Sequence, residues 1–162
     1  MAADRARVLM AIFEGQEAGG VAGVTRVARL ARAQNAALRV AYFHRIPPGR
    51  EDRRGRIIVE TDREMARIEH EIVAAVTDAA GAAVECVVRF GARVRELDME
   101  LDVYAPGTLA VLAPSGAAQR WRWWRVRRRL ARRAAVRVVV LDLRDGDSAR
   151  PGRRLATLDQ RA

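Results

Sequence analysis

The sequence contains no lysine, so all 30 of its basic residues are arginine. Against 20 acidic residues they give a net charge of +10 and an isoelectric point near 11.4. Such a balance ordinarily points to a polyanionic partner. Arginine codons are GC-rich and lysine codons AT-rich, however, so a GC-rich coding sequence alone favours arginine. The charge is therefore weaker evidence for such a partner than its size suggests.

Cysteine and long apolar runs are also scarce. The single cysteine, Cys86, excludes an intramolecular disulfide, and the two histidines, His44 and His70, form no metal-ligand spacing with it. We therefore expect no metal site and a reducing, cytoplasmic location. No apolar run approaches the ~18 residues of a membrane span, so we expect no transmembrane segment.

Acidic residues are missing altogether between Val103 and Leu141. Nine arginines fall in this stretch, while the remaining basic and acidic residues almost cancel. An anionic partner, if there is one, should therefore bind here.

Five short apolar runs alternate with segments whose apolar residues recur every three or four positions, a pattern typical of strands alternating with helices. The predicted strands are 8–13, 38–43, 84–88, 109–113 and 136–141. The predicted helices cover 21–31, 65–79, 94–101 and 120–133. The order predicts an α/β fold, a doubly wound three-layer sandwich with a five-stranded parallel sheet.

The boundaries carry their own signals. Asn35 is a plausible left-handed helix stop, Thr61 and Glu64 have capping-box spacing, and Gly81 would end the second helix. Between the second strand and that helix, residues 44–58 are rich in Pro, Gly and charge and predict a long surface loop. We expect one domain over 1–143 and a flexible tail over 144–162.

Doubly wound sheets bind ligands at the carboxyl ends of their strands. In this chain that edge comprises Phe13 with Glu14 and Gly15, the turn after Phe43, and residues 113–116, which include Ser115 and Gly116; Arg125 follows on the next helix. Ser115 and Gly116 would present N–H groups at a helix start, and Arg125 would hold a phosphate there. The candidate ligand site is made of Phe13, Glu14, Ser115, Gly116 and Arg125.

The order of elements over residues 5–142 resembles the universal stress protein family. The similarity lies in the 8–13 strand followed by Gly15, the long helix ending at Gly81, the strand leading to Gly91, and the last helix running into 136–141. It implies the strand order 3-2-1-4-5, a role in stress response and a homodimer. Val136, Val138 and Val140 on the edge strand would form the dimer interface.

Many members of that family bind ATP through a Gly-x2-Gly-x9-Gly-Ser/Thr signature, with an Asp at the end of the first strand. Here Ala113 and Gly116 have the first spacing, but the final pair falls on 126–127 or, aligned from the last strand, on 124–125. Phe13 stands at the acidic position, with Glu14 displaced by one. The resemblance therefore implies a degenerate or absent ATP site and no required cofactor, with bound ATP as an open alternative.

The Trp/Arg helix 120–133 allows three interpretations. It could supply an anion pocket, it could bind a polyanion or an anionic membrane surface, or it could simply be amphipathic. In the last case its buried stripe is Trp123, Val126, Leu130 and Ala134, and its solvated stripe Arg122, Arg125, Arg129 and Arg132. Three tryptophans within four residues exceed one buried stripe, so at least one should be exposed or covered by a second subunit.

No set of residues predicts an enzyme. Ser115 lacks a nucleophile-elbow context, and Asp98, Glu100 and Asp102 are spaced as a solvated helix face. We therefore expect a stress-response binding or regulatory module that signals to an unidentified protein partner, residual ATP hydrolysis being remote. The alternative is a peripheral nucleic-acid or anionic-membrane binder acting through helix 120–133.

Overall fold

A five-stranded parallel sheet forms the centre of the molecule, as the computed structural model shows for residues 6–81, 83–114, 116–130, 133 and 135–142. Its strands are β1 (Arg7–Phe13), β2 (Ala37–His44), β5 (Glu85–Phe90), β6 (Thr108–Leu112) and β7 (Arg137–Leu141). They lie in the order β5-β2-β1-β6-β7. Counted along the chain as one to five, this is 3-2-1-4-5, so the expected topology is confirmed.

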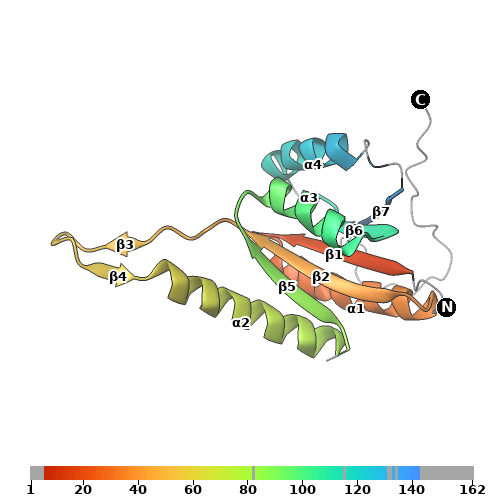
Figure 1. Cartoon of the computed structure of the whole chain (residues 1–162), viewed down its shortest axis with the longest axis horizontal. Helices are drawn as coiled ribbons and strands as arrows, with labels where there is room; N and C mark the ends of the chain where they lie inside the picture. Colours follow the sequence, from red (N-terminus) through yellow and green to blue (C-terminus); the bar gives the residue numbers. More distant parts are fainter. Residues whose placement is uncertain (1–5, 82, 115, 131–132, 134, 143–162) are drawn as a thin grey trace.

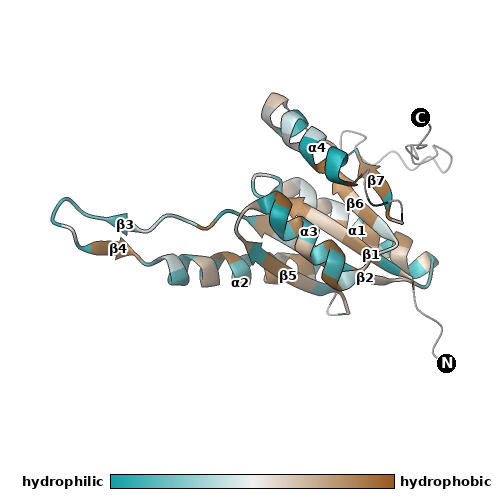
Figure 2. Cartoon of the chain, turned by 45° about the horizontal axis from the view of Figure 1, so that its top comes forward, coloured by the Kyte–Doolittle hydropathy of each residue, from teal (hydrophilic) through white to brown (hydrophobic). Residues whose placement is uncertain are grey.

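Helices cover both faces of the sheet (Figure 1). One face carries α1 (Glu17–Ala33) and α2 (Thr61–Ala80), and the other carries α3 (Arg93–Tyr104) and α4 (Ala117–Leu130). Along β1, Met10 and Ile12 pack toward α1, while Leu9 and Ala11 pack toward α3. Because both faces of β1 are buried, its run reads as continuously apolar, which is visible in Figure 2.

The end of α1 is the left-handed stop that the sequence predicts. Asn35 has φ 51°, the N–H of Ala36 donates to the carbonyl of Ala31 at 2.8 Å, and that of Asn35 donates to Arg32 at 3.0 Å. These two bonds form a Schellman motif. They turn the chain directly into β2.

The beginning of α2 differs from the prediction. Glu60 is the N-cap and makes no side-chain cap hydrogen bond, so Thr61 lies one residue inside the helix and no capping box forms. The other end is as expected, since Gly81 has φ 85° and its N–H donates to Thr77.

The predicted loop 44–58 contains a hairpin that the sequence analysis missed, made of β3 (Arg50–Glu51) and β4 (Ile57–Val59). Asp52 closes its turn, because its Oδ1 accepts from the N–H groups of Arg54 and Arg56 at 2.8 and 2.9 Å. Gly55, at φ 73°, completes the turn. The hairpin projects from the sheet as an arm (Figure 1).

The solvated face predicted for α3 is wrong at Glu100, whose side chain is 1% exposed. It accepts a 2.6 Å hydrogen bond from Arg39 of β2 and a 2.9 Å hydrogen bond from Arg89 of β5. Arg39 also pairs with Glu85 and lies over the ring of Tyr104. Spacing alone could not reveal these cations, because they come from two other strands.

The amphipathic prediction for α4 is right at its buried stripe, where Val126 and Leu130 are buried and Trp123 is partly so. Arg125 and Arg129 of the predicted solvated stripe are exposed, and Arg129 in addition pairs with Asp98 of α3. Arg133 pairs likewise with Asp102 at 2.6 Å. One ion pair thus connects α4 to α3, and a second connects α3 to Arg133, which follows α4.

Parts of some predictions lie outside the described residues, namely Ser115, Arg132, Ala134 and the tail 144–162. Among the described helices, none is long and apolar enough to cross a membrane. The same residues contain no group of three or more His, Cys, Asp or Glu side chains placed to hold a metal ion.

Candidate functional site

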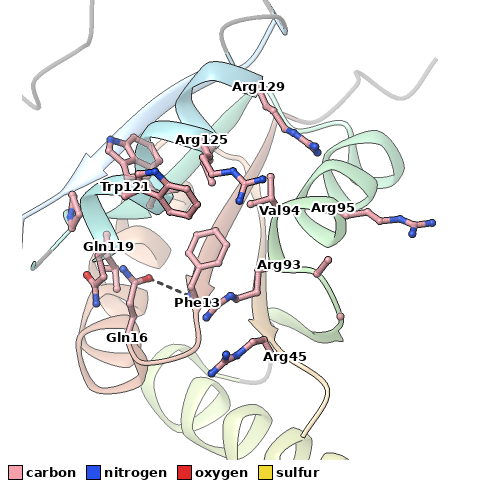
Figure 3. A pocket seen from close by; sticks show the side chains of 17 residues that line it. Phe13, Gln16, Arg45, Arg93, Val94, Arg95, Gln119, Trp121, Arg125 and Arg129 are labelled. Atoms are coloured by element: carbon pink, nitrogen blue, oxygen red, sulfur yellow. Dashed lines mark hydrogen bonds between the residues drawn. The ribbon is translucent and has the colours of Figure 1, made fainter. Parts of the chain in front are cut away.

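A pocket of about 360 Å³ opens at the carboxyl edge of the sheet (Figure 3). It is bounded by the end of β1, the residue after β2, the first turn of α3 and the inner side of α4. Carboxyl ends of parallel strands are where ligands of such folds bind. The volume falls within the range of small-molecule sites.

Aromatic and aliphatic side chains make up much of the wall. Phe13 and Trp121 line it from β1 and α4, and Trp123 completes the aromatic set. Phe13 is held in place by Phe43 of the neighbouring strand, their ring centroids being 5.4 Å apart. A rigid apolar surface is therefore already formed at the carboxyl end of the central strand.

Five arginines line the same pocket: Arg45, Arg93, Arg95, Arg125 and Arg129. Of the lining residues in the described part of the chain, none is acidic. In Figure 3 the side chains of Arg93 and Arg125 approach Phe13 from α3 and α4, whereas those of Arg95 and Arg129 point away. The pocket is thus apolar in its walls and cationic at two of its sides.

Arg125 differs from the other pocket arginines in its surroundings. Its guanidinium lies over the ring of Trp121 at 5.0 Å, and it forms no ion pair with any described carboxylate. Arg129, one turn further, is paired with Asp98. Of the two α4 arginines that line the pocket, Arg125 is therefore the one that no described carboxylate engages.

Glu14 lies just behind the pocket wall, directly after β1. Its Oε2 is 3.1 Å from Arg45 Nε and 3.1 Å from Arg93 Nη1, and its Oε1 is 3.6 Å from His44 Nε2. Burial would raise the pKa of the Glu14 carboxyl, but the hydrogen bond from Arg45 and the charges of His44 and Arg45 lower it below the usual 4.5. Glu14 is therefore an ionised internal counter-ion of two pocket arginines.

In the family that the sequence resembles, the last part of the ATP signature aligns with residues 124–127. In this chain those positions belong to one continuous helix. Residues 124–127 all lie inside α4, which begins at Ala117. Their backbone N–H groups are used within the helix and are not available to a phosphate. Gly116 has φ 145° and its carbonyl accepts from the N–H of Arg120, which places it at the start of α4.

The structure brings some of the predicted site residues together and separates others. Phe13 and Arg125 line the pocket, and Glu14 contacts it through Arg45 and Arg93. Gly116 is not among the lining residues, and Ser115 lies outside the described part of the chain.

Arg93 and Arg45 were missed by the sequence analysis. Arg93 follows β5 and Gly91, and Arg45 follows β2 directly, so both lie at the same carboxyl edge as Phe13. The sequence analysis includes the turn after Phe43 in this edge without naming Arg45, and applying the same rule to the strand that ends before Gly91 would have found Arg93. Trp121 could not be found in this way, because the helical phase of α4 decides which tryptophan faces the pocket.

Two of the predicted interface residues, Val138 and Val140, lie on β7 at the edge of the sheet, and Val136 directly precedes this strand. Val136, Val138 and Val140 are partly buried and pack against the core between the sheet and the α3 and α4 helices. Their side chains therefore belong to this chain's own core, and it is the backbone of β7 that lies at the edge.

A second, more acidic hollow of about 410 Å³ adjoins the first and shares Gln16 and Gln119 with it. Glu17 lines it and accepts hydrogen bonds from Tyr42 Oη at 2.5 Å and from the Gly15 N–H at 2.8 Å. Burial would raise the pKa of Glu17, but these hydrogen bonds lower it. The Glu17 carboxylate therefore stabilises the turn after β1 through these two hydrogen bonds.

No family model matches the sequence, and no curated protein matches it. Solved structures do. A universal stress protein crystallised with cAMP is 20% identical at a TM-score of 0.55, over 86% of this chain and 98% of its own.

Two further structures are similar to a lesser degree. A universal stress protein family member from Burkholderia pseudomallei is 16% identical at a TM-score of 0.46, over 84% of this chain and 95% of its own. The universal stress protein of Archaeoglobus fulgidus in complex with dAMP gives the same identity and TM-score, over 84% and 96%. The fold expected from the sequence is confirmed by the first of these structures, whose TM-score exceeds 0.5.

Proposed function

Because the chain has the universal stress protein fold, we propose that it is a binding and regulatory module of the stress response, which takes a small anionic ligand in the pocket between β1, α3 and α4. The observation that carries this proposal is the placement of Arg93 and Arg125 on two walls of an apolar pocket at the carboxyl edge of the sheet. Apolar walls with a few convergent polar groups are typical of ligand sites.

We further propose that the ATP site of this fold is degenerate here. The helical backbone at 124–127, the apolar Phe13 at the acidic position and the engagement of Glu14 by arginines all support this. Two structures of similar fold hold cAMP and dAMP, so nucleotides belong in any ligand test. The proposal assigns no catalytic residue and requires no cofactor.

The direct test is calorimetry on protein stripped of carried-over ligand, with cAMP, AMP and magnesium ATP at low and high salt. We expect one-site binding of a small anion that persists at high salt, and ATP to bind more weakly than the smaller anions. Micromolar ATP binding at both salts would contradict the degenerate site. Magnesium-dependent ATP turnover that is lost in Gly116→Val would contradict the non-enzymatic role.

Regulation through a homodimer forms the second part of the proposal. The N–H of Arg137 and the carbonyl of Leu141 bond toward β6, so the alternate residues Val138 and Val140 direct their backbone groups to the open edge. Val140→Pro should weaken the dimer by removing one donor, whereas Val140→Ala should not. Sedimentation equilibrium measures the difference, and a monomeric parent protein would contradict the edge-strand dimer.

A second candidate function is binding of a nucleic acid or anionic membrane surface by α4. It is favoured by Trp121 and Trp124, which are 60% and 51% exposed, and by the stacking of Arg128 on Trp124 at 4.8 Å. Its weakness is that Arg129 and Arg133 are engaged by Asp98 and Asp102. Affinity for DNA or anionic vesicles that falls steeply with salt would favour this function over the pocket.

A further inference from the structure

We infer that the ligand of the pocket is a flat aromatic acid with a single carboxylate, held over Phe13 between Arg93 and Arg125, and that Glu14 sets its affinity and restricts its charge. This inference rests on the proposed function, since it names the ligand class of the same pocket. It is argued from the walls, the cations and the internal carboxylate in turn.

The walls select a ring. Phe13 is fixed by its contact with Phe43, and Trp121 stands across the pocket under the guanidinium of Arg125. Aromatic side chains favour offset or edge-to-face contact with another ring, and a guanidinium stacks on flat groups as well as pairing with anions. A planar aromatic body matches this lining better than a flexible chain.

The cations select a negative group and suggest a carboxylate. Arg125 has no ionic partner among the described residues, while Arg93 already contacts the Glu14 carboxylate at 3.1 Å. The guanidinium of Arg93 is therefore already oriented for contact with a carboxylate, that of Glu14. Tight phosphate sites use backbone N–H groups of a loop, and the α4 wall offers none at 124–127.

Glu14 limits the charge that the pocket accepts. Its carboxylate neutralises part of the positive charge of Arg45 and Arg93 without lining the pocket. A monoanion between Arg93 and Arg125 gains more from the arginines than it loses to Glu14. A dianion doubles both the attraction and the repulsion, but its desolvation cost grows with the square of its charge, so the reduced positive potential beside Glu14 no longer compensates for it.

Three probes that share the naphthalene ring system and differ in charge test the inference on the full chain. They are neutral 2-naphthamide, singly charged 2-naphthoate and doubly charged 2-naphthyl phosphate, followed by calorimetry and tryptophan fluorescence. We expect naphthoate to bind about tenfold or more tightly than naphthamide, as a charged hydrogen bond would give. We also expect naphthoate to bind more tightly than naphthyl phosphate.

Variants connect these preferences to named residues. Glu14→Gln should strengthen the binding of naphthyl phosphate more than that of naphthoate, whereas Glu71→Gln, which removes a carboxylate paired with Arg67 on α2, should change neither. Arg125→Met should weaken naphthoate binding about tenfold. Its matched control is Arg128→Met, because Arg128 also stacks on a tryptophan but does not line the pocket.

Each contrary result has one meaning. Equal binding of naphthamide and naphthoate, equal losses in the Arg125 and Arg128 variants, or an unchanged preference in Glu14→Gln would overturn the inference. Saturable binding of a nucleotide with no binding of naphthoate would also overturn it while leaving the proposed function standing. If neither the naphthalene probes nor the nucleotides bind, the proposed function falls with it.

Discussion

Arg39 of β2 donates a 2.6 Å hydrogen bond to Glu100 of α3, whose carboxylate is almost completely withdrawn from solvent. Arg89 of β5 supplies the second cation. A buried charge that loses a partner is costly, because water cannot replace it. The two strands and the helix are thus held together around one carboxylate.

We therefore predict that Arg39→Met lowers the free energy of unfolding by about 3 kcal/mol, measured by urea denaturation. The double variant Arg39→Met/Glu100→Met should recover much of this loss, because the orphaned charge is gone. Arg67→Met, which removes an exposed arginine paired with Glu64 and Glu71 on the surface of α2, should change stability little. An equal loss in both single variants would contradict the role of burial.

Gly20 lies where α1 crosses β1, and a Cβ placed there would come within 2.5 Å of Ile12 Cγ2. Gly20→Ala should destabilise by about 1–3 kcal/mol through overpacking, although alanine favours helices elsewhere. Gly23→Ala is the matched control, because its Cβ would meet side-chain ends at longer distances, with Met10 Cε at 3.0 Å, Leu112 Cδ2 at 3.4 Å and Leu141 Cδ1 at 3.6 Å. The thermal midpoint of Gly20→Ala should be clearly lower than that of Gly23→Ala. Equal midpoints would show that α1 can move away from β1 and relieve the contact with Ile12.

Both tyrosines of the chain should resist ionisation in the folded state. Burial raises the pKa of Tyr42 and of Tyr104, and the hydrogen bond to Glu17 raises that of Tyr42 further. In the unfolded chain they titrate near pH 10. The folded protein therefore holds these protons more tightly, and the stability this gives is present below pH ~10 and is lost as pH rises above it.

The measurement is ultraviolet absorbance of tyrosinate against pH, with and without guanidinium chloride. We expect the tyrosinate absorbance of the folded protein to rise at higher pH than that of the unfolded chain. In Tyr42→Phe only the titration of Tyr104 should remain, and it should occur at lower pH than that of Tyr42. Coincident folded and unfolded curves would contradict the burial of the two phenols.

Arg129 and Asp98 connect α4 to α3, so their charges should be exchangeable only as a pair. Asp98→Arg should lower stability by about 1 kcal/mol and speed amide exchange in α4, since it leaves two arginines facing each other. The double variant Asp98→Arg/Arg129→Asp, which reverses both charges of the pair, should restore slow amide exchange in α4. Failure of the double variant to restore it would show that the pair does not hold α4.

Local sequence patterns, namely apolar runs and helix-ending residues, predicted most of the fold. The apolar runs of β1 and β2, the Asn35 stop and the Gly81 stop depend on neighbours a few residues away, which a sequence displays directly. The β3 and β4 hairpin was missed because it depends on Asp52 bonding to two N–H groups, not on an apolar pattern.

The candidate site was predicted only in part, for a related reason. Phe13 follows from its position at the end of a strand, and Arg125 from its place on the arginine-rich helix. The pairing of Glu14 with Arg93 joins residues 79 positions apart. Such a contact depends on strand order and loop path together, which no local pattern contains.

The pocket cations described above are all guanidiniums, and the chain has no lysine. A guanidinium keeps its proton throughout the physiological pH range, so these five charges stay constant there. Lysine acetylation, a common means of switching such charges off, has no side chain to act on. Changes in acidity or acetyl supply therefore leave these five pocket charges unaltered.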